Sequence, residues 1–395
     1  MSATEEPAGA PLKTKVSLLT ITKEWTRLGC IGFGGPPTHI ALLRQMCVEE
    51  RNWIGASEFE DGIAATSLLP GPASTQLAIF CAWRLRGPIG GILGGICFIV
   101  PGLILILCLS AAFLARHPPT WILGAAAGAG AAVPAVAIHA ARGFVPASWK
   151  RIGSSASQRS RWITYGLLGG AAAATIGPYL VIVLLACGLV EVALRRERGV
   201  ENSHHGMVLG ALVGHGVAAG GLFALAWVAF KVGALSYGGG FVIVPLMQHD
   251  AVTTYHWMTG GQFLDAVALG QVTPGPVVLT TAVVGYAASG VRGGLLATVI
   301  SFTPSFLFVL LGGPRFDQIR SNSGIQSFLT GAGPAVIGAI AGSSIPLGLA
   351  FQHDSQIPVL AGAVVWLFAL RRGVVSGLMF AGGVGVLLAL SGVPV

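Results

Sequence analysis

Two motifs containing glycine and proline each occur twice in the chain. Pro70-Gly71-Pro72 recurs as Pro274-Gly275-Pro276, and Phe33-Gly34-Gly35-Pro36 recurs as Tyr237-Gly238-Gly239-Gly240. Glycine and proline interrupt the hydrogen-bond ladder of a helix and expose backbone N–H groups at the positive end of a half-helix. Such N–H groups bind anions. The motifs therefore predict a site for an oxyanion, although hinges or close helix packing would use the same residues.

Polar side chains beside these four breaks are candidate donors to the same ligand. Ser74, Ser236 and Thr281 belong to this group, although any one of them would also suit a bond to a neighbouring helix. The predicted substrate-binding set consists of Arg27, Phe33, Gly34, Gly35, Pro36, Thr38, His39, Pro70, Gly71, Pro72, Thr75, Gln76, Lys231, Tyr237, Gly238, Gly239, Gln271, Thr273, Pro274, Gly275, Pro276 and Thr280.

A cation recurs at the same distance before each aromatic-Gly-Gly motif. Arg27 and Lys231 both lie six residues before the aromatic residue. A charge at the bilayer centre costs at least about 2.5 kcal/mol, so charges kept there usually serve a function. The two cations would neutralise a divalent anion near the midplane. The alternative places Arg27 at the membrane interface, within the polar stretch 23–27.

Two carboxylates recur at the start of the segments that contain Pro-Gly-Pro. They are Asp61 and Asp265. A desolvated carboxylate can bind and release a proton, which would couple transport to a proton gradient. The alternative, which the helix dipole favours, is that both residues cap helices.

The matched residues belong to an internal repeat. A shift of 204 positions aligns residues 29–98 with the second half without a gap, and pairs Trp53 with Trp257 and Gly90 with Gly294. Repeats of this length indicate a duplicated structural unit. Matching broken helices in two repeats indicate a transporter binding site.

The composition places these motifs in a membrane. Of 395 residues, 53% are hydrophobic and 10% are charged, whereas an ordinary soluble domain has about 25% charged residues. The 58 glycines and 22 prolines lie inside long apolar runs. These features exclude a disordered chain, a coiled coil and a secreted disulfide scaffold. Long runs without ten-residue alternation also exclude a β-barrel, so the predicted class is an all-α polytopic membrane protein.

About ten to thirteen membrane segments are predicted, because a span needs about 20 apolar residues. The clear candidates are 89–115, 120–141, 291–313, 325–350 and 373–393. Stretches 162–194 and 357–393 each form one tilted helix or two shorter ones. Pro-Gly-Pro interrupts 62–82 and 263–287, and Gly-Gly interrupts 16–42 and 208–247.

Basic residues predict the orientation of the two halves. Loop 142–161 is rich in Lys and Arg, but its counterpart near 351–357 has none; Arg371-Arg372 has an uncharged counterpart near 175–179. Because positive loops face the cytoplasm, the repeats have opposite orientations. The predicted organisation is a disordered tail (1–15), a first membrane repeat (16–195), a connector (196–207) and a second, inverted repeat (208–395).

Several functional classes lack support in the sequence. It contains no HExxH, Walker A or GxSxG motif, and its six cysteines form no CxxC pair. No enzyme activity, cofactor or metal site is therefore expected. The net charge of +8 is explained by orientation signals, so no nucleic-acid partner is expected. The polar segment 1–15 does not resemble a signal peptide.

The chain resembles the chromate ion transporter (CHR) family, in its long-chain, two-domain type. The resemblance rests on Phe33-Gly34-Gly35-Pro36-Pro37-Thr38-His39-Ile40, Trp53 and Leu69-Pro70-Gly71-Pro72, and on the second copies of these motifs. It implies export of chromate across the bacterial inner membrane, driven by the proton motive force, which confers chromate resistance. Sulfate is the expected mimic. The second copy departs from the pattern, since Gly240 replaces Pro36 and the Thr-His pair is missing.

The predicted function is therefore secondary active export of chromate by alternating access. Sulfate or another oxyanion is an alternative substrate, and a gated anion channel of the same fold is an alternative mechanism. An intramembrane enzyme is a third alternative, but the sequence offers no nucleophile–base pair for it. The expected partners are the oxyanion and the lipid bilayer, with a homodimer left open.

Overall fold

The structure, a computed structural model, describes residues 16–67, 69, 71–152, 155–175, 180–196, 221–236, 243–312 and 322–394. Every regular element within these ranges is helical, which confirms the predicted all-α class. The helices are α1 (Leu18–Ile31), α2 (Pro36–Arg44), η1 (Gln45–Glu50), α3 (Ala56–Thr66), α4 (Ala73–Phe113), α5 (Thr120–Arg151), α6 (Ala156–Thr175), α7 (Leu180–Arg196), α8 (Leu222–Leu235), α9 (Ile243–Gln248), η4 (His249–Thr254), α10 (Gly260–Val272), η5 (Val277–Leu279), α11 (Thr280–Gly312), α13 (Ser323–Gly342), α14 (Ser344–Leu349), α15 (Gln356–Val364), η7 (Val365–Ala369) and α16 (Val374–Leu390).

Within the described ranges, four helical stretches are long and apolar enough to cross a bilayer. They are Ala73–Phe113, Thr120–Arg151, Val277–Gly312 and Ser323–Leu349. Shorter apolar helices accompany them, and large hydrophobic side chains such as Val299 and Leu311 are exposed, as expected for helices that face lipid. The chain is a multi-pass membrane protein.

The predicted helix breaks are present where the structure describes them. Helix α1 ends at Ile31 and α2 begins at Pro36, and the Pro-Gly-Pro motifs separate α3 from α4 and α10 from η5. Proline at the first helical position of α2 lacks an N–H group, which removes one of the unpaired donors that a helix start otherwise carries. The stretches 162–194 and 357–393 are each divided into two helical pieces, so the two-helix alternative is correct for both.

Helices α4 and α11 reverse direction sharply, which the sequence analysis did not predict. The backbone leaves the helical region at Arg86–Gly87 and at Ser289–Gly290, where both glycines have positive φ. Behind the first turn, Gly91 packs on Trp83 and Gly95 on Ile79, so the two arms of α4 lie side by side. The predicted span 89–115 is therefore the second arm of a hairpin. Likewise, the predicted loop 142–161 is wrong over most of its length, because α5 continues to Arg151 and α6 begins at Ala156.

The gap-free alignment of the halves is also wrong beyond the Pro-Gly-Pro motifs. Gly71 and Gly275 match with an offset of 204, but the hairpin turns at Gly87 and Gly290 match with an offset of 203. Gly90 consequently corresponds to Gly293, not to Gly294. The second copy begins with the 3₁₀ turn η5, whose three residues rise about 6 Å, as do four α-helical residues. One residue fewer thus covers the same length.

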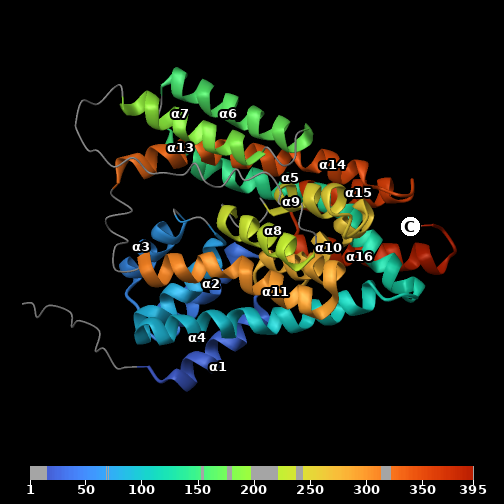
Figure 1. Ribbon diagram of the computed structural model, residues 1–395, viewed down its shortest axis with the longest axis horizontal. Coiled ribbons are helices and arrows are strands. Elements are labelled where there is room, and N and C mark those ends of the chain that lie inside the picture. Colours follow the sequence, from blue (N-terminus) through green and yellow to red (C-terminus); the bar gives the residue numbers. More distant parts are fainter. Residues whose placement is uncertain are drawn as a thin grey trace, which may run out of the picture.

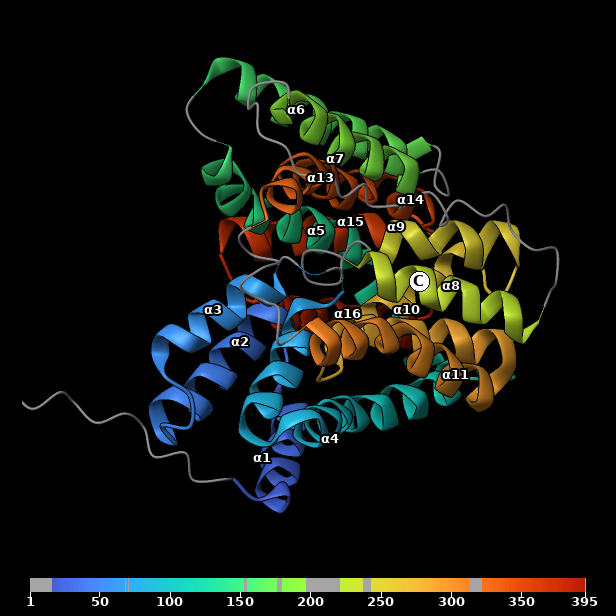
Figure 2. The ribbon, with the colours of Figure 1, turned by 60° about the vertical axis from the view of Figure 1, so that its left-hand side comes forward.

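The two halves of the chain are interleaved. Helices α6 and α7 of the first half pack on α13 of the second half, whereas α15 and α16 of the second half pack on α5 of the first. Helices α6, α7 and α13 lie on one side of the molecule, and helices α1 and α4 lie on the opposite side (Figure 1, Figure 2). Glycines permit the close crossings, since a Cβ on Gly338 or Gly385 would strike the backbone of the facing helix.

Candidate functional site

Each described Pro-Gly-Pro glycine forms the tip of a helical hairpin. Gly62 of α3 packs on Phe80 of α4, so these segments run back along each other and meet at Gly71. In the second half Gly270 packs on Thr280, with the tip at Gly275. The φ angles of the two tip glycines are +123° and +102°. Side chains other than glycine rarely adopt such angles, so both positions require glycine.

Each hairpin tip donates a hydrogen bond to the other half of the chain. The amide of Gly71 donates to the carbonyl of Ser236 (2.9 Å), directly after α8. The amide of Gly275 donates to the carbonyl of Gly32 (2.9 Å), directly after α1. Ser236 and Gly32 are the residues before the aromatic-Gly-Gly motifs. The structure thus brings both tips to the ends of the helices that precede these motifs.

His39 ties the first break to the first hairpin. Its Nε2 lies 2.9 Å from the carbonyl oxygen of Gly32 and must donate, since a carbonyl only accepts. In the neutral imidazole Nδ1 then accepts from the hydroxyl of Ser74, 3.1 Å away. The ring is buried and meets Phe98 edge-on. His39 is therefore oriented by two partners, and its role in the structure is to position the start of α4.

Buried polar side chains lie at the first tip. Ser74, Thr75 and Gln76, in the first turn of α4, are all buried. Among the residues described, Thr75 Oγ1, Ser236 Oγ and Ser305 Oγ are buried without a hydrogen-bond partner. Buried polar atoms are almost always paired, so such groups call for an explanation.

Ser305 is a further polar residue at this tip, outside the set predicted from the sequence. It lies in α11, and its hydroxyl oxygen is 3.0 Å from the position that a Cβ on Gly71 would occupy. The amide nitrogen of Gln76 approaches the same position. The internal repeat contains a signal for this residue. With the offset of 203, Pro304-Ser305 matches Pro101-Gly102, so the second half has a serine where the first half has a glycine.

The second tip has a different chemistry. Apolar side chains of Val277, Val278 and Leu279 follow it, and Gly102 stands where Ser305 stands at the first tip. Thr273 donates to the carbonyl of Leu269 (2.8 Å) and Thr280 to that of Val277 (2.8 Å), so both hydroxyls are satisfied within their own helices. Gln271 is buried, and its Nε2 has no hydrogen-bond partner among the described residues.

The two predicted cations each have a carboxylate partner. Arg27 has a side chain that is 64% exposed and lies 3.7 Å from Glu24, as expected for the interfacial alternative. Lys231 is largely buried and forms an ion pair with Asp250 of η4. The structure therefore does not place an unpaired cation at either of these positions.

The two aspartates occupy different surroundings. Asp61 is exposed on α3. Asp265 is half-buried on α10, and its Oδ1 lies against Gly130 of α5. Helix α10 packs along α5, whereas α3 makes no comparable contact with α13, within the described residues. The halves of the molecule thus share local structures but differ in how these helices dock.

The other predicted residues lie around the first break or outside the described part. Gly34 and Gly35 have φ angles of +96° and +75°, and Gly35 caps α2, which begins at Pro36. Thr38 contacts Gly34, and Phe33 is exposed. Pro72 precedes α4, whereas Pro274 and Pro276 are buried beside Gly275. Four predicted site residues fall outside the described residues: Pro70, Tyr237, Gly238 and Gly239.

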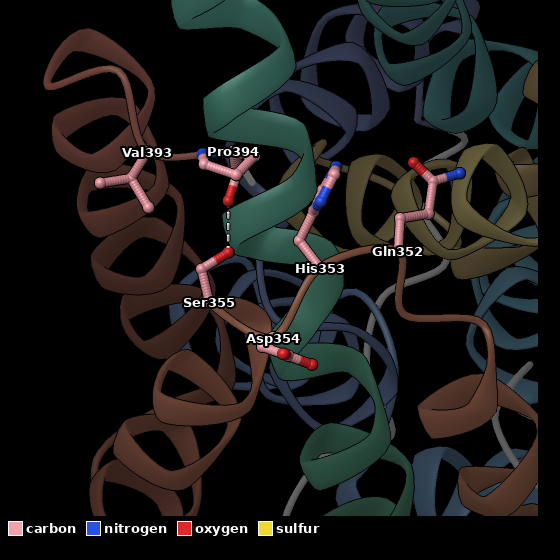
Figure 3. Close-up of a pocket in the computed structure, with 6 residues that line it drawn as sticks. All are labelled: Gln352, His353, Asp354, Ser355, Val393 and Pro394. Carbon is pink, nitrogen blue, oxygen red and sulfur yellow. Dashed lines mark hydrogen bonds between the residues drawn. The ribbon is translucent and has the colours of Figure 1, made fainter.

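A surface pocket elsewhere contains none of the predicted residues. It lies between the segment after α14 and the end of the chain, and Ser355 donates to the carbonyl of Pro394 across it (Figure 3). Its lining consists of Gln352, His353, Asp354, Ser355, Val393 and Pro394. In the described part of the chain, no cluster of three or more His, Cys, Asp or Glu residues could hold a metal ion.

The duplicated breaks correspond to a known family. The Chromate transporter family matches residues 19–193 and 223–389, once in each half. The chain belongs to this family. The resemblance to its long-chain, two-domain type is confirmed, and membership of a transporter family confirms the prediction that the chain is not an enzyme.

Curated relatives extend over nearly the whole chain. A chromate transport protein of Cupriavidus metallidurans is 30% identical over 93% of this chain and 91% of its own length. One of Pseudomonas aeruginosa is 32% identical over 81% and 79%. The uncharacterized transporter YwrB of Bacillus subtilis is 29% identical over 47% of this chain but 91% of its own length. No solved structure matches the chain.

Proposed function

We propose that the protein is a secondary active transporter that exports chromate across the bacterial inner membrane and confers chromate resistance. The observation that carries the proposal is the reciprocal pair of hydrogen bonds from Gly71 to Ser236 and from Gly275 to Gly32. These bonds join the broken helices of both halves at one place. Relatives 30% and 32% identical, named as chromate transport proteins, support chromate as the substrate.

The oxyanion is recognised by backbone and hydroxyl donors. Chromate has four acceptor oxygens, and the N–H groups at the start of α4, together with Thr75 and Gln76, offer donors to them. Lys231 and Arg27 contribute only a long-range potential, because each has a carboxylate partner. Sulfate, with the same shape and charge, is the expected competitor.

Transport follows an alternating-access cycle between two inverted repeats. The basic residues of 142–161 lie at the end of α5 and the start of α6, and the corresponding segment 351–357 has none; this opposite distribution supports the inversion. Helix α10 packs on α5, but its counterpart α3 has no comparable contact with α13 in the described residues, and this asymmetry supports two conformations that exchange the roles of the halves. Movement of one half against the other breaks the bonds at the hairpin tips and exposes the ligand to the opposite side of the membrane.

Asp265 is the better candidate of the two aspartates for proton coupling. A carboxylate packed against a helix without a counter-charge favours binding a proton over staying charged. Among the described residues no cation forms an ion pair with Asp265. The charged residues and histidines on the elements packed against α10 are His139, Arg142, Lys150 and Arg151 on α5, Arg84 and Arg86 on α4, Arg292 on α11, and His249 and Asp250 in η4.

The test is uptake of labelled chromate into inside-out vesicles that contain the protein. Export from the cell appears there as uptake, and an acidic vesicle interior should drive accumulation above the external concentration. A protonophore should abolish the accumulation, and excess sulfate should reduce it. Equilibration without accumulation would instead indicate the gated-channel alternative, since a channel cannot move an ion against its gradient.

A further inference from the structure

We propose that the protein binds one oxyanion per chain, at the first hairpin tip, and that Ser305 of the second half is a ligand of that anion. The inference rests on the proposed function, because it assumes that an oxyanion is the substrate. It goes further by assigning the site to one of two similar tips, and by naming a binding residue that lies far from the repeated motifs.

The hydroxyls around Gly71 carry the first step. Thr75, Ser236 and Ser305 are each 0% exposed, and their hydroxyl oxygens have no hydrogen-bond partner within the described residues. A buried hydroxyl left unpaired has lost its hydration without replacing it, which is unfavourable. All three residues adjoin one tip: Thr75 is in the first turn after it, the carbonyl of Ser236 accepts from the Gly71 amide, and the hydroxyl of Ser305 lies beside Gly71. Their unpaired hydroxyls are therefore unfavourable without a ligand. The oxygens of a tetrahedral dianion can accept a hydrogen bond from each of the three hydroxyls, and such an ion needs donors alone.

The second tip supplies the contrast. The residues that follow Gly275 are Val277, Val278 and Leu279, which offer no side-chain donor. At the position of Ser305, Gly102 packs directly against the carbonyl of Pro274. Burying a dianion among these groups would remove its hydration without replacing it. The similar backbone at the two tips therefore serves binding at the first and packing at the second.

Ser305 also explains how both halves sense one ligand. The hairpin tip with Gly71 belongs to the first half, whereas Ser236 and Ser305 belong to the second. An anion held between them bridges the two halves, so its binding stabilises their close approach. In the structure Gly71 bonds to Ser236 and lies beside Ser305, and the ligand enters when the halves move apart.

The experiment compares Ser305→Ala with Ser301→Ala in purified protein. Both serines are 0% exposed in α11, but Ser301 is satisfied, since it lies 3.1 Å from Thr281 Oγ1 and donates to the carbonyl of Thr298. A hydrogen bond to a charged group is worth about 1.5–3 kcal/mol, which corresponds to at least about tenfold in affinity. Ser305→Ala should thus raise the Kd for chromate and for sulfate about tenfold, and Ser301→Ala should leave it unchanged. Equilibrium binding of labelled sulfate should saturate at one ion per chain.

A second variant keeps the inference testable if Ser305→Ala is poorly produced. Thr75→Val preserves the shape of the side chain and removes its hydroxyl, so it should also raise the Kd about tenfold. Normal affinity in well-folded Ser305→Ala, or two ions per chain, would overturn the site while leaving the transporter intact. If the wild-type protein bound and transported neither anion, the proposed function itself would be wrong.

Discussion

The amide nitrogen of Gly71 lies 2.9 Å from the carbonyl oxygen of Ser236, and this bond joins the tip of a hairpin in the first half to the end of a helix in the second. Gly275 makes the equivalent bond to Gly32. Both glycines have a positive φ, so each tip places its N–H group in a direction that other residues would reach only with strain. The two hydrogen bonds at the hairpin tips thus depend on backbone geometry at Gly71 and Gly275.

Replacement of Gly71 by alanine should lower chromate transport at least tenfold. The φ of +123° strains any other residue by about 1–3 kcal/mol, and the new methyl group would displace the Gln76 amide from the tip. Uptake into inside-out vesicles measures the effect, with protein content determined by immunoblot. Gly87→Ala is the matched control, because Gly87 also has a positive φ but no atom lies within 4 Å of its Cβ position. Equal loss in both variants would show that strain alone is responsible.

Replacement of Asp265 by asparagine should remove the dependence of transport on the pH gradient. Asparagine cannot bind or release a proton, so chromate should still equilibrate across the membrane but should not accumulate. Asp61 is exposed on α3, so Asp61→Asn should retain most of the gradient-driven chromate accumulation. The measurement is chromate uptake with and without an imposed pH gradient. Gradient-driven accumulation by Asp265→Asn would contradict proton coupling at this residue.

The pair of Lys231 and Asp250 should behave as a structural ion pair. Removal of one member leaves an unpaired, largely buried charge, which costs about 3–5 kcal/mol. Lys231→Met should therefore lower Tm in detergent, and the double variant Lys231→Met/Asp250→Leu should recover most of the loss. Sulfate affinity of the double variant should remain near that of the wild type. A large loss of affinity would instead give Lys231 the role of a binding cation.

Glu191 should be the most important carboxylate for the packing of α6 and α7. It accepts from Arg161 (3.0 and 3.2 Å), Arg195 (2.8 Å) and Tyr165 (3.2 Å), and its side chain is 3% exposed. Glu191→Leu leaves two arginines unpaired and should cost about 3 kcal/mol or more. The exposed pair of Arg44 and Glu60 is the control, since Glu60→Leu should cost no more than about 1 kcal/mol. Thermal unfolding in detergent compares the two.

Much of the helix pattern can be read from the sequence, because glycine and proline change backbone conformation locally. The breaks near Gly35 and Gly71 follow from residue type alone, and so does the all-helical class. The reversal at Gly87 could not be inferred in this way. Arg84 and Arg86 indicate a loop equally well, and the reversal is stabilised by small residues further along, such as Gly91 and Gly95, that pack on the first arm.

The candidate site was only partly predictable for a different reason. Gly71, Thr75 and Gln76 lie in one motif and were identified together. Ser305 lies in another helix of the other half, and only tertiary packing brings it to Gly71. The different docking of Asp61 and Asp265 likewise depends on which face each half presents to the other, and matched sequence positions do not specify that.

The crossed bonds at the hairpin tips also bear on how the polypeptide must be assembled. Residues 16–196 contain the donor Gly71 without its acceptor, and the acceptor Gly32 without its donor. An unsatisfied backbone group in an apolar environment costs several kcal/mol, so neither half is complete as a separate product. Joining the two in one chain supplies them in equal numbers, at the same time and in the same membrane.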